Sequence, residues 1–198
     1  MTARWAPSDD HATPLTQEEQ TQLVPSFITT RDELNRAEQQ AIAEAARVVL
    51  RRPPTTEALL DATYLLGLHR RMFRSVWKWA GKIRTTERNI GVEPWRIRSD
   101  LQQLLDDAQA WVQYGSYPPD EIALRFHHRV VAIHCFANGN GRHARLAADL
   151  LAIDLGQAAF TWGAGDVAPV GEVRRAYIAA LKQADQHDYA SLLRFARS

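Results

Sequence analysis

The chain has 198 residues, of which 45% are hydrophobic and 24% are charged. This length and composition predict one globular domain with a sizeable hydrophobic core. The 24 basic and 23 acidic residues leave a net charge of +1, which argues against a nucleic-acid-binding surface. The polar start lacks a targeting segment, no apolar run approaches the roughly 18 residues that span a bilayer, and Cys135 is the only cysteine. We therefore predict a cytoplasmic protein whose partners include neither nucleic acid nor a membrane.

Residues 1–28 are predicted to form an N-terminal tail and a short helix. Thr16 and Glu19 have the spacing of a capping box at the start of that helix, and Pro25 prevents it from running on. Residues 29–198 are predicted to form a single helical domain, because apolar residues recur at helical spacing and no internal repeat is present.

The domain is predicted to open with a long helix over residues 29–50, which ends before Pro53. Its expected apolar stripe consists of Leu34, Ala37, Ala41, Ala45 and Val48. The next helix is expected to begin at Thr55 or Thr56, with an inner face formed by Leu59, Thr63, Leu66 and Phe73.

The periodicity changes after Gly81. Residues 82–97, KIRTTERNIGVEPWRI, are rich in Thr and Ile and are broken by Gly91 and Pro94, which predicts a short β-hairpin or extended flap. Helical spacing then returns, and helices are predicted over residues 99–114, 120–133, 141–155, 172–184 and 188–197. The fold class expected from this pattern is all-α, with one small β-hairpin flap.

The residues that carry chemistry are concentrated in HCFANGNGRHAR, residues 134–145, at the predicted hinge between two helices. Gly139, Asn140 and Gly141 allow a turn whose main-chain amides converge on one point. The helix that follows adds its unpaired N-terminal amides and the positive end of its dipole. The hinge is therefore a candidate phosphate cradle.

Charged side chains flank this cradle. Arg142 and Arg145 are three residues apart and emerge on the same side of the helix, so one polyphosphate could engage both. Cations in the first helical turn are disfavoured by about 0.3–1 kcal/mol each, so an anion is expected to compensate them. His134 closes the preceding helix beside the same loop and is the natural general base.

Plainer interpretations compete with this one. A Gly-Asn-Gly turn and an arginine pair are each common on surfaces, and only their coincidence with a histidine favours a site. A P-loop is excluded because the Lys-Ser/Thr pair is absent. Cys135 is predicted to be a small buried residue and Phe136 an apolar anchor. A hydrolytic zinc site is a minor alternative, because no acidic ligand accompanies the histidines at zinc-site spacing: His127, His128, His134 and His143.

Residues 134–145 resemble the signature of the Fic family, H-P-F-x-[D/E]-G-N-G-R-x-x-R. Seven of the nine specified positions match at the right spacing, while Cys135 replaces the proline and Asn138 the acidic residue. Residues 79–97 resemble the flap of that family, and residues 187–196 resemble its closing helix. The motif and the start TPLTQEEQ are similar to a Fic subgroup called mobile mystery protein B.

The resemblance implies a Fic-like helical domain that transfers AMP from ATP to a Ser, Thr or Tyr hydroxyl of a target protein, a nucleotidyltransferase activity. It makes His134 the base that deprotonates the hydroxyl. The implied nucleotide-binding residues are Gly139, Asn140, Gly141, Arg142 and Arg145. The implied flap, which would hold the target by strand addition, consists of Thr85, Thr86, Glu87, Arg88, Asn89 and Ile90.

Two further roles follow from the resemblance. The family's acidic residue at position 138 holds Mg²⁺, and Asn138 keeps a carbonyl oxygen there without the charge. Many Fic proteins inhibit themselves through an S/T-x-x-x-E-G/N segment, which Thr29–Leu34 resembles, so that Glu33 would pair with Arg145. An ordinary capping box formed by Thr30 and Glu33 is the alternative, and a separate regulatory partner protein is another possible source of control.

Other functions stay open within the same fold. A catalytically weak or inactive nucleotide-binding regulatory protein is one, and Asn138 is the argument for it. A phosphotransferase and an enzyme that removes AMP are the others, because these chemistries differ in how the nucleotide lies and not in the motif.

Overall fold

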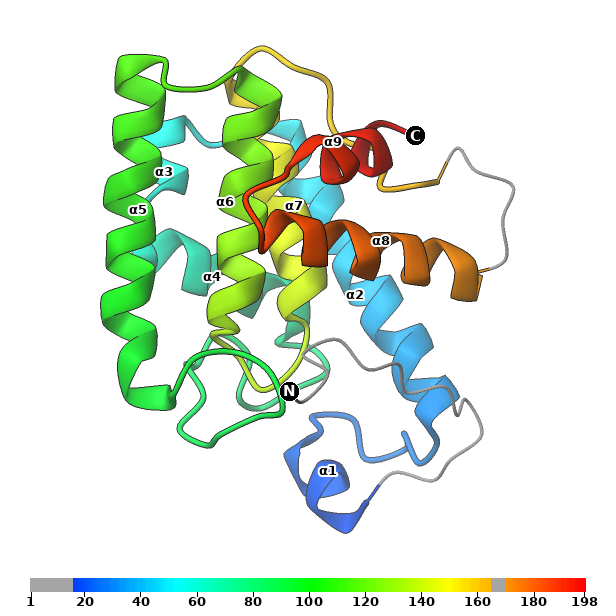
Figure 1. Ribbon diagram of the computed structural model, residues 1–198. Coiled ribbons are helices and arrows are strands. Elements are labelled where there is room, and N and C mark those ends of the chain that lie inside the picture. The colour runs from blue at the N-terminus through cyan, green and yellow to red at the C-terminus, as the bar shows by residue number, and fades with distance from the viewer. Residues whose placement is uncertain (1–15, 165–169) are drawn as a thin grey trace.

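The fold was described from a computed structural model, which covers residues 16–164 and 170–198 (Figure 1). The predicted tail over residues 1–15 therefore lies outside the described residues. The elements are α1 (Gln17–Gln22), α2 (Arg31–Arg51), α3 (Thr56–Leu59), α4 (Ala62–Phe73), the 3-10 turn η1 (Pro94–Arg96), α5 (Ile97–Tyr114), α6 (Pro119–Ile133), α7 (Asn140–Asp154), α8 (Val170–Ala184) and α9 (Ala190–Arg197). The prediction of an all-α fold is confirmed.

Helices α6 and α7 run side by side through the middle of the molecule, and the other elements surround them (Figure 1). Helix α5 packs along α6, α8 and α9 pack on each other, and α2 packs on α4. The connection from α6 to α7 lies at the same end of the bundle as the long loop between α4 and α5 (Figure 1). This end therefore brings the predicted hinge and the predicted flap together.

The central position of α6 and α7 follows from their sequences. The four residues predicted to face inward from α6 are all buried: Ile122, Phe126, Val130 and Ile133. Helix α7 turns Ala144, Ala147 and Ala148 inward, each fully buried. Small side chains let neighbouring helix backbones approach closely, which allows α7 to be surrounded on most sides.

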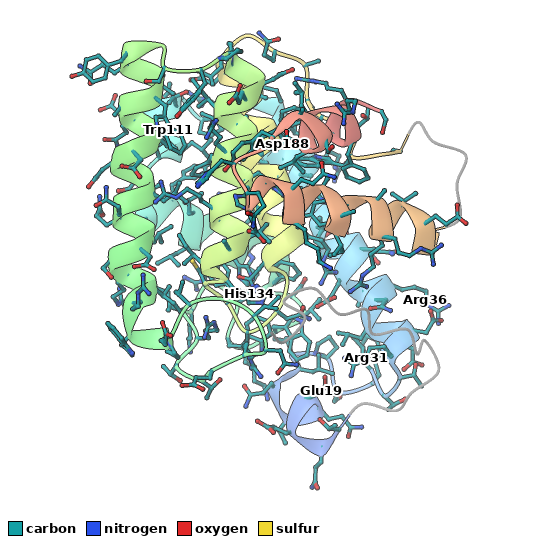
Figure 2. The ribbon with its side chains drawn as sticks, viewed as in Figure 1. Glu19, Arg31, Arg36, Trp111, His134 and Asp188 are labelled. Carbon is teal, nitrogen blue, oxygen red and sulfur yellow. The ribbon has the colours of Figure 1, made fainter. Side chains whose placement is uncertain are left out.

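The N-terminal segment is tied to α2 and α4. Thr16 and Glu19 form the predicted capping box at the start of α1, and the Glu19 carboxylate pairs with Arg31 of α2 at 2.9 Å (Figure 2). A single isolated β-bridge in the described residues joins Leu23 to Trp77, beyond the end of α4. None of the described helices combines the length and the apolar character needed to cross a membrane.

Some predicted helix faces were wrong. The helix predicted from residue 55 to residue 73 is broken after Leu59, because the Asp61 side chain accepts a hydrogen bond from the Tyr64 amide and caps a new helix. Thr63 is consequently exposed, and the inner face of α4 is formed by Leu65, Leu68, His69, Met72 and Phe73. In α2, Val48 is half-exposed, and Val49 is the buried residue in its place.

Of the two predictions for this segment, the extended flap is confirmed and the β-hairpin was wrong, since residues 82–93 form an extended loop without paired strands. The guanidinium of Arg84 donates hydrogen bonds to the carbonyls of Thr86 and Val92, which a partner strand would otherwise have engaged. Gly91 turns the loop with φ +101, a conformation that favours glycine. Hydrogen bonds from the Arg84 side chain therefore hold this segment in place of the main-chain hydrogen bonds of a β-hairpin.

Among the described residues, the buried histidines His69, His127 and His143 have strongly lowered pKa values. Burial lowers the pKa of His69 to about 2, of His127 to about 3 and of His143 to about 4. Each ring forms a hydrogen bond with an uncharged partner through its Nε2. The partner of His69 is the Asn138 carbonyl, and that of His143 is the Leu65 carbonyl. The partner of His127 is the Tyr177 hydroxyl. All three are therefore neutral in the folded protein at pH 7.

These histidines make folding sensitive to acid. Each has a lowered pKa in the folded state, so the unfolded chain binds more protons below the ordinary histidine value of 6.5, and stability falls as the pH falls. Between pH 7 and pH 5 we expect a loss of about 2 kcal/mol per histidine. Asp149 offsets part of this loss, because burial raises its pKa to about 6. Urea unfolding at a series of pH values measures the slope, and equal stability at pH 7 and pH 5 would contradict it.

Candidate active site

The hinge is a short loop with a left-handed residue at each end. His134 ends α6 with φ 58 and ψ 60, and Gly139 precedes α7 with φ 78 and ψ 2. The left-handed region costs a residue other than glycine about 1–2 kcal/mol, so the position of His134 is held by its surroundings. Figure 2 shows His134 at this end of α6.

The Asn140 side chain closes this loop. Its Oδ1 accepts a hydrogen bond from the Phe136 amide at 2.9 Å, and its Nδ2 donates to the Phe136 carbonyl at 2.8 Å. Phe136 is buried and stacks on His69, with ring centroids 3.6 Å apart, which confirms its role as an anchor. Asn140 can therefore offer only its main-chain amide to a ligand, because its side chain is engaged.

His69 connects the hinge to the flap. Its Nδ1 accepts a hydrogen bond from the Gly81 amide at 3.0 Å, so its Nε2 carries the proton and donates to the Asn138 carbonyl at 3.1 Å. Sequence analysis did not single out His69. Its spacing from Leu65 and Phe73 on the buried face of α4 was the available signal.

The two glycines of the motif have different surroundings. A Cβ added to Gly139 would lie 2.5 Å from the ring of Phe73, whereas a Cβ added to Gly141 would meet nothing within 4 Å. Within residues 16–164 and 170–198, no side chain caps the N-terminus of α7. The first amides of a helix have no intrahelical acceptor, so this end presents N–H groups beside open space, as an anion site requires.

Arg142 is held by a glutamate that sequence analysis missed. Its Nη2 lies 2.8 Å from Oε2 of Glu38, and its guanidinium carbon lies 5.3 Å from the ring centroid of Phe73. Glu38 is only 2% exposed, and its Oε1 also accepts a hydrogen bond from Trp77 Nε1 at 2.6 Å. Helix α2 therefore reaches into the hinge with a buried carboxylate.

Arg145 faces different neighbours. Its guanidinium carbon lies 4.3 Å from the ring centroid of Tyr177 in α8 and 5.6 Å from that of Trp162. Its Nε is buried and has no hydrogen-bond partner in the part of the chain that the structure describes. Both motif arginines thus pack on aromatic rings and are only partly exposed.

The inhibitory role expected of Glu33 is not supported by its position. Its carboxylate accepts hydrogen bonds from the amides of Thr29 and Thr30, which lower its pKa, and the Thr30 hydroxyl caps α2 in return. This is the capping-box alternative. Glu38 was detectable in the sequence, because it lies four residues after Leu34 and three before Ala41, on the buried stripe of α2.

Asn138 is exposed and poorly suited to hold a metal by itself. Its Oδ1 accepts a hydrogen bond from the Gly139 amide at 2.7 Å, and its Nδ2 lies 3.4 Å from Oε1 of Glu38. The described residues contain no group of three or more metal-binding side chains. One neutral oxygen that already accepts a hydrogen bond does not make a Mg²⁺ site. The zinc alternative gains no support either.

Cys135 is buried, and burial raises the pKa of its thiol to about 12. Only the thiolate is a good nucleophile, so this residue is chemically inert at pH 7. The prediction of a small buried residue is confirmed.

The flap lies against the hinge. Residues 85–89 are exposed, and Ile90 is half-buried. The Val92 amide donates to the Ile133 carbonyl at 3.3 Å, and the Arg84 amide donates to the Cys135 carbonyl at 3.0 Å. The two ends of the loop therefore bind the residues on both sides of His134.

Comparison with known proteins identifies the family that this chain resembles. The sequence profile of the Fic/DOC family matches residues 59–152, from the end of α3 to α7. A protein adenylyltransferase, fic-1, from Caenorhabditis elegans is 31% identical over 139 residues, which are 66% of this chain and 25% of that protein. The chain therefore spans about a quarter of the length of this curated relative.

Solved structures agree with the sequence match. Fic-1 (residues 134–508) from C. elegans superposes with a TM-score of 0.60 at 27% identity, over 79% of this chain and 46% of that chain. The BepC protein of Bartonella tribocorum, solved with bound AMPPNP, has the same fold, with a TM-score of 0.62 at 21% identity over 92% of this chain and 97% of that chain. The motif, the helical fold and these matches identify residues 59–152 as a Fic/DOC domain.

Proposed function

We propose that this protein transfers AMP from ATP to the hydroxyl of a Ser, Thr or Tyr residue in a target protein. The observation that carries the proposal is the hinge itself: His134 ends α6 beside the uncapped N-terminus of α7, from which Arg142 and Arg145 extend. The relative named as a protein adenylyltransferase and the AMPPNP-bound BepC structure support this activity and this nucleotide class.

Each part of the site has a role in the proposed reaction. The His134 imidazole accepts the proton of the target hydroxyl, whose oxygen attacks the α-phosphorus of ATP. A bond forms between that oxygen and the α-phosphorus, the bond to the bridging oxygen breaks, and pyrophosphate leaves. The amides of Asn140 and Gly141 and the guanidiniums of Arg142 and Arg145 stabilise the charge on the phosphates, and the Gly139 amide joins them if it leaves Asn138 Oδ1.

The flap would hold the target chain. Residues 85–90 form no strand ladder in the structure, and residues 85–89 are exposed. An extended target segment could pair with this main chain, which gives affinity through backbone hydrogen bonds and makes few demands on the target sequence.

In this proposal, Mg²⁺ binds together with ATP and has no separate site on the protein. Magnesium in nucleotide sites is commonly bound by substrate phosphates together with one or two carboxylates, and the hinge offers no carboxylate at position 138. A cytoplasmic location, where ATP is abundant, fits the substrate and stays a prediction, as does a regulatory partner protein.

The His134→Ala variant tests the proposed base. After incubation with ATP and Mg²⁺, intact-mass analysis of a hydroxyl-bearing target and of the protein itself should show the mass of AMP added by the parent and a loss of about 100-fold or more in the variant's rate. ATP binding, measured by calorimetry, should be largely retained, because the phosphate ligands are unchanged.

His187→Ala is a matched control, since His187 is exposed and also has a positive φ of 64. This variant also removes a histidine with a left-handed backbone conformation, but at a position away from the hinge. It should leave the rate of AMP transfer unchanged. Transfer of phosphate instead of AMP would favour the phosphotransferase alternative. Binding without any addition would favour the inactive regulatory protein, and retained transfer in His134→Ala would remove this residue from the mechanism.

We further propose that Glu38 restrains the site by occupying Arg142. A guanidinium paired with a buried carboxylate at 2.8 Å cannot bind a phosphate through the same N–H groups until that pair is broken. The restraint expected of Glu33 is thus assigned to Glu38 of the same helix.

Paired variants test this assignment. Glu38→Ala should raise the rate of AMP transfer on the order of tenfold, which corresponds to about 1.4 kcal/mol of competition. Glu33→Ala should leave the rate unchanged and lower the thermal stability slightly through the loss of the capping box. Rates are compared at equal concentrations of nucleotide-binding sites. An increase confined to Glu33→Ala would restore the original assignment and exclude Glu38.

A further inference from the structure

Arg84 is a buried arginine that contacts main-chain carbonyls. It lies at the base of the flap and is 5% exposed. Its Nε donates to the His134 carbonyl at 2.6 Å, its Nη1 donates to the Thr86 carbonyl at 2.9 Å, and its Nη2 donates to the Val92 carbonyl. One side chain therefore joins the end of α6 to both arms of the flap.

The chemistry of arginine makes this junction rigid. The guanidinium is planar and presents its N–H groups in a fixed fork, so three carbonyls bound by one fork have fixed positions relative to one another. Burial lowers the pKa of Arg84, but a guanidinium remains a cation at pH 7. A cation at the C-terminus of α6 also interacts favourably with the helix dipole.

Gly91 shows how tightly the flap is held against His134. A Cβ added to Gly91 would lie 2.5 Å from Cβ of His134 and 2.7 Å from Nη2 of Arg84. The flap backbone thus packs directly on the first carbon of the histidine side chain. A shift of the flap would release this contact, and a shift of His134 would displace the flap.

We propose that Arg84 is a positioning residue that sets His134 and the flap main chain relative to each other, so that a hydroxyl presented by the flap arrives at the imidazole. This role rests on the proposed function and deepens it. Arg84 acts through the His134 carbonyl and the flap carbonyls, and it is assigned no contact with the nucleotide. Small errors of placement are costly in such reactions, because the reacting atoms must be held close to bonding distance.

The Arg84→Lys variant tests the proposal. Lysine keeps the charge but has a single donor atom, which cannot bridge three carbonyls in one plane. The kcat for AMP transfer, expressed per nucleotide-binding site, should fall about 10-fold or more, while the KM for ATP changes less than about 2-fold. A second measurement needs no activity: cleavage after Glu87 by a glutamate-specific protease should become about 10-fold faster, because the flap is released.

Arg197→Lys is the matched control. Arg197 also donates to two main-chain carbonyls, those of Ala158 and Ala159, and pairs with Asp120. Its loss should lower thermal stability without changing kcat, the KM for ATP or cleavage after Glu87. Equal effects of Arg84→Lys and Arg197→Lys on kcat and on cleavage would overturn the positioning role.

If Arg84→Lys does not fold, Gly91→Ala tests the same junction, because the added methyl group would collide with both Cβ of His134 and Nη2 of Arg84 and force the flap away from them. It should reproduce the lower kcat and the faster cleavage. Unchanged cleavage after Glu87 overturns the proposal whatever the activity of the parent. A parent that transfers no AMP overturns the proposed function instead, and cleavage in the Arg84 variant then still decides whether this residue holds the flap.

Discussion

The structure depends on one constraint: the chain must turn from α6 into α7 within a few residues and still leave the N-terminus of α7 uncovered. Two side chains make this possible. Asn140 satisfies both polar groups of Phe136 from inside the turn, and His69 binds the Asn138 carbonyl from α4. These contacts provide hydrogen-bond partners for the polar main-chain groups of Phe136 and Asn138 without using the amides at the start of α7. Those amides therefore remain available for a ligand.

The same end of the molecule buries two opposite charges that do not meet each other. Glu38 is held by Trp77 and Arg142, and Arg84 is held by carbonyls. A buried charge is tolerated only when its hydrogen bonds are satisfied, so these partners are required and not incidental. The two arrangements differ in what a ligand could do to them, because a phosphate can compete for Arg142, whereas the carbonyls around Arg84 belong to the fold.

Most helices, and the hinge between α6 and α7, could be predicted from the sequence because they depend on local rules. The capping box at Thr30 and the periodicity of α6 are read within a few residues, and the spacing of residues 134–145 is itself the motif. Glu38 and Arg84 were missed because each has a partner that is distant in the sequence: Arg142 lies 104 residues after Glu38, and His134 lies 50 residues after Arg84. The hairpin was predicted wrongly for a local reason: Thr and Ile favour strands, but the Arg84 side chain binds the carbonyls of Thr86 and Val92.

The departure at position 138 and the position of Glu38 have one physical explanation. The Asn138 amide lies 3.4 Å from the Glu38 carboxylate as a donor. An aspartate there would place a second carboxylate at about this distance, and two such groups repel or must share a proton. Asparagine removes that conflict and adds a donor to a glutamate that is almost completely buried. Asn138 therefore provides no negative charge for a metal ion, and for the same reason it allows α2 to place the Glu38 carboxylate in the hinge.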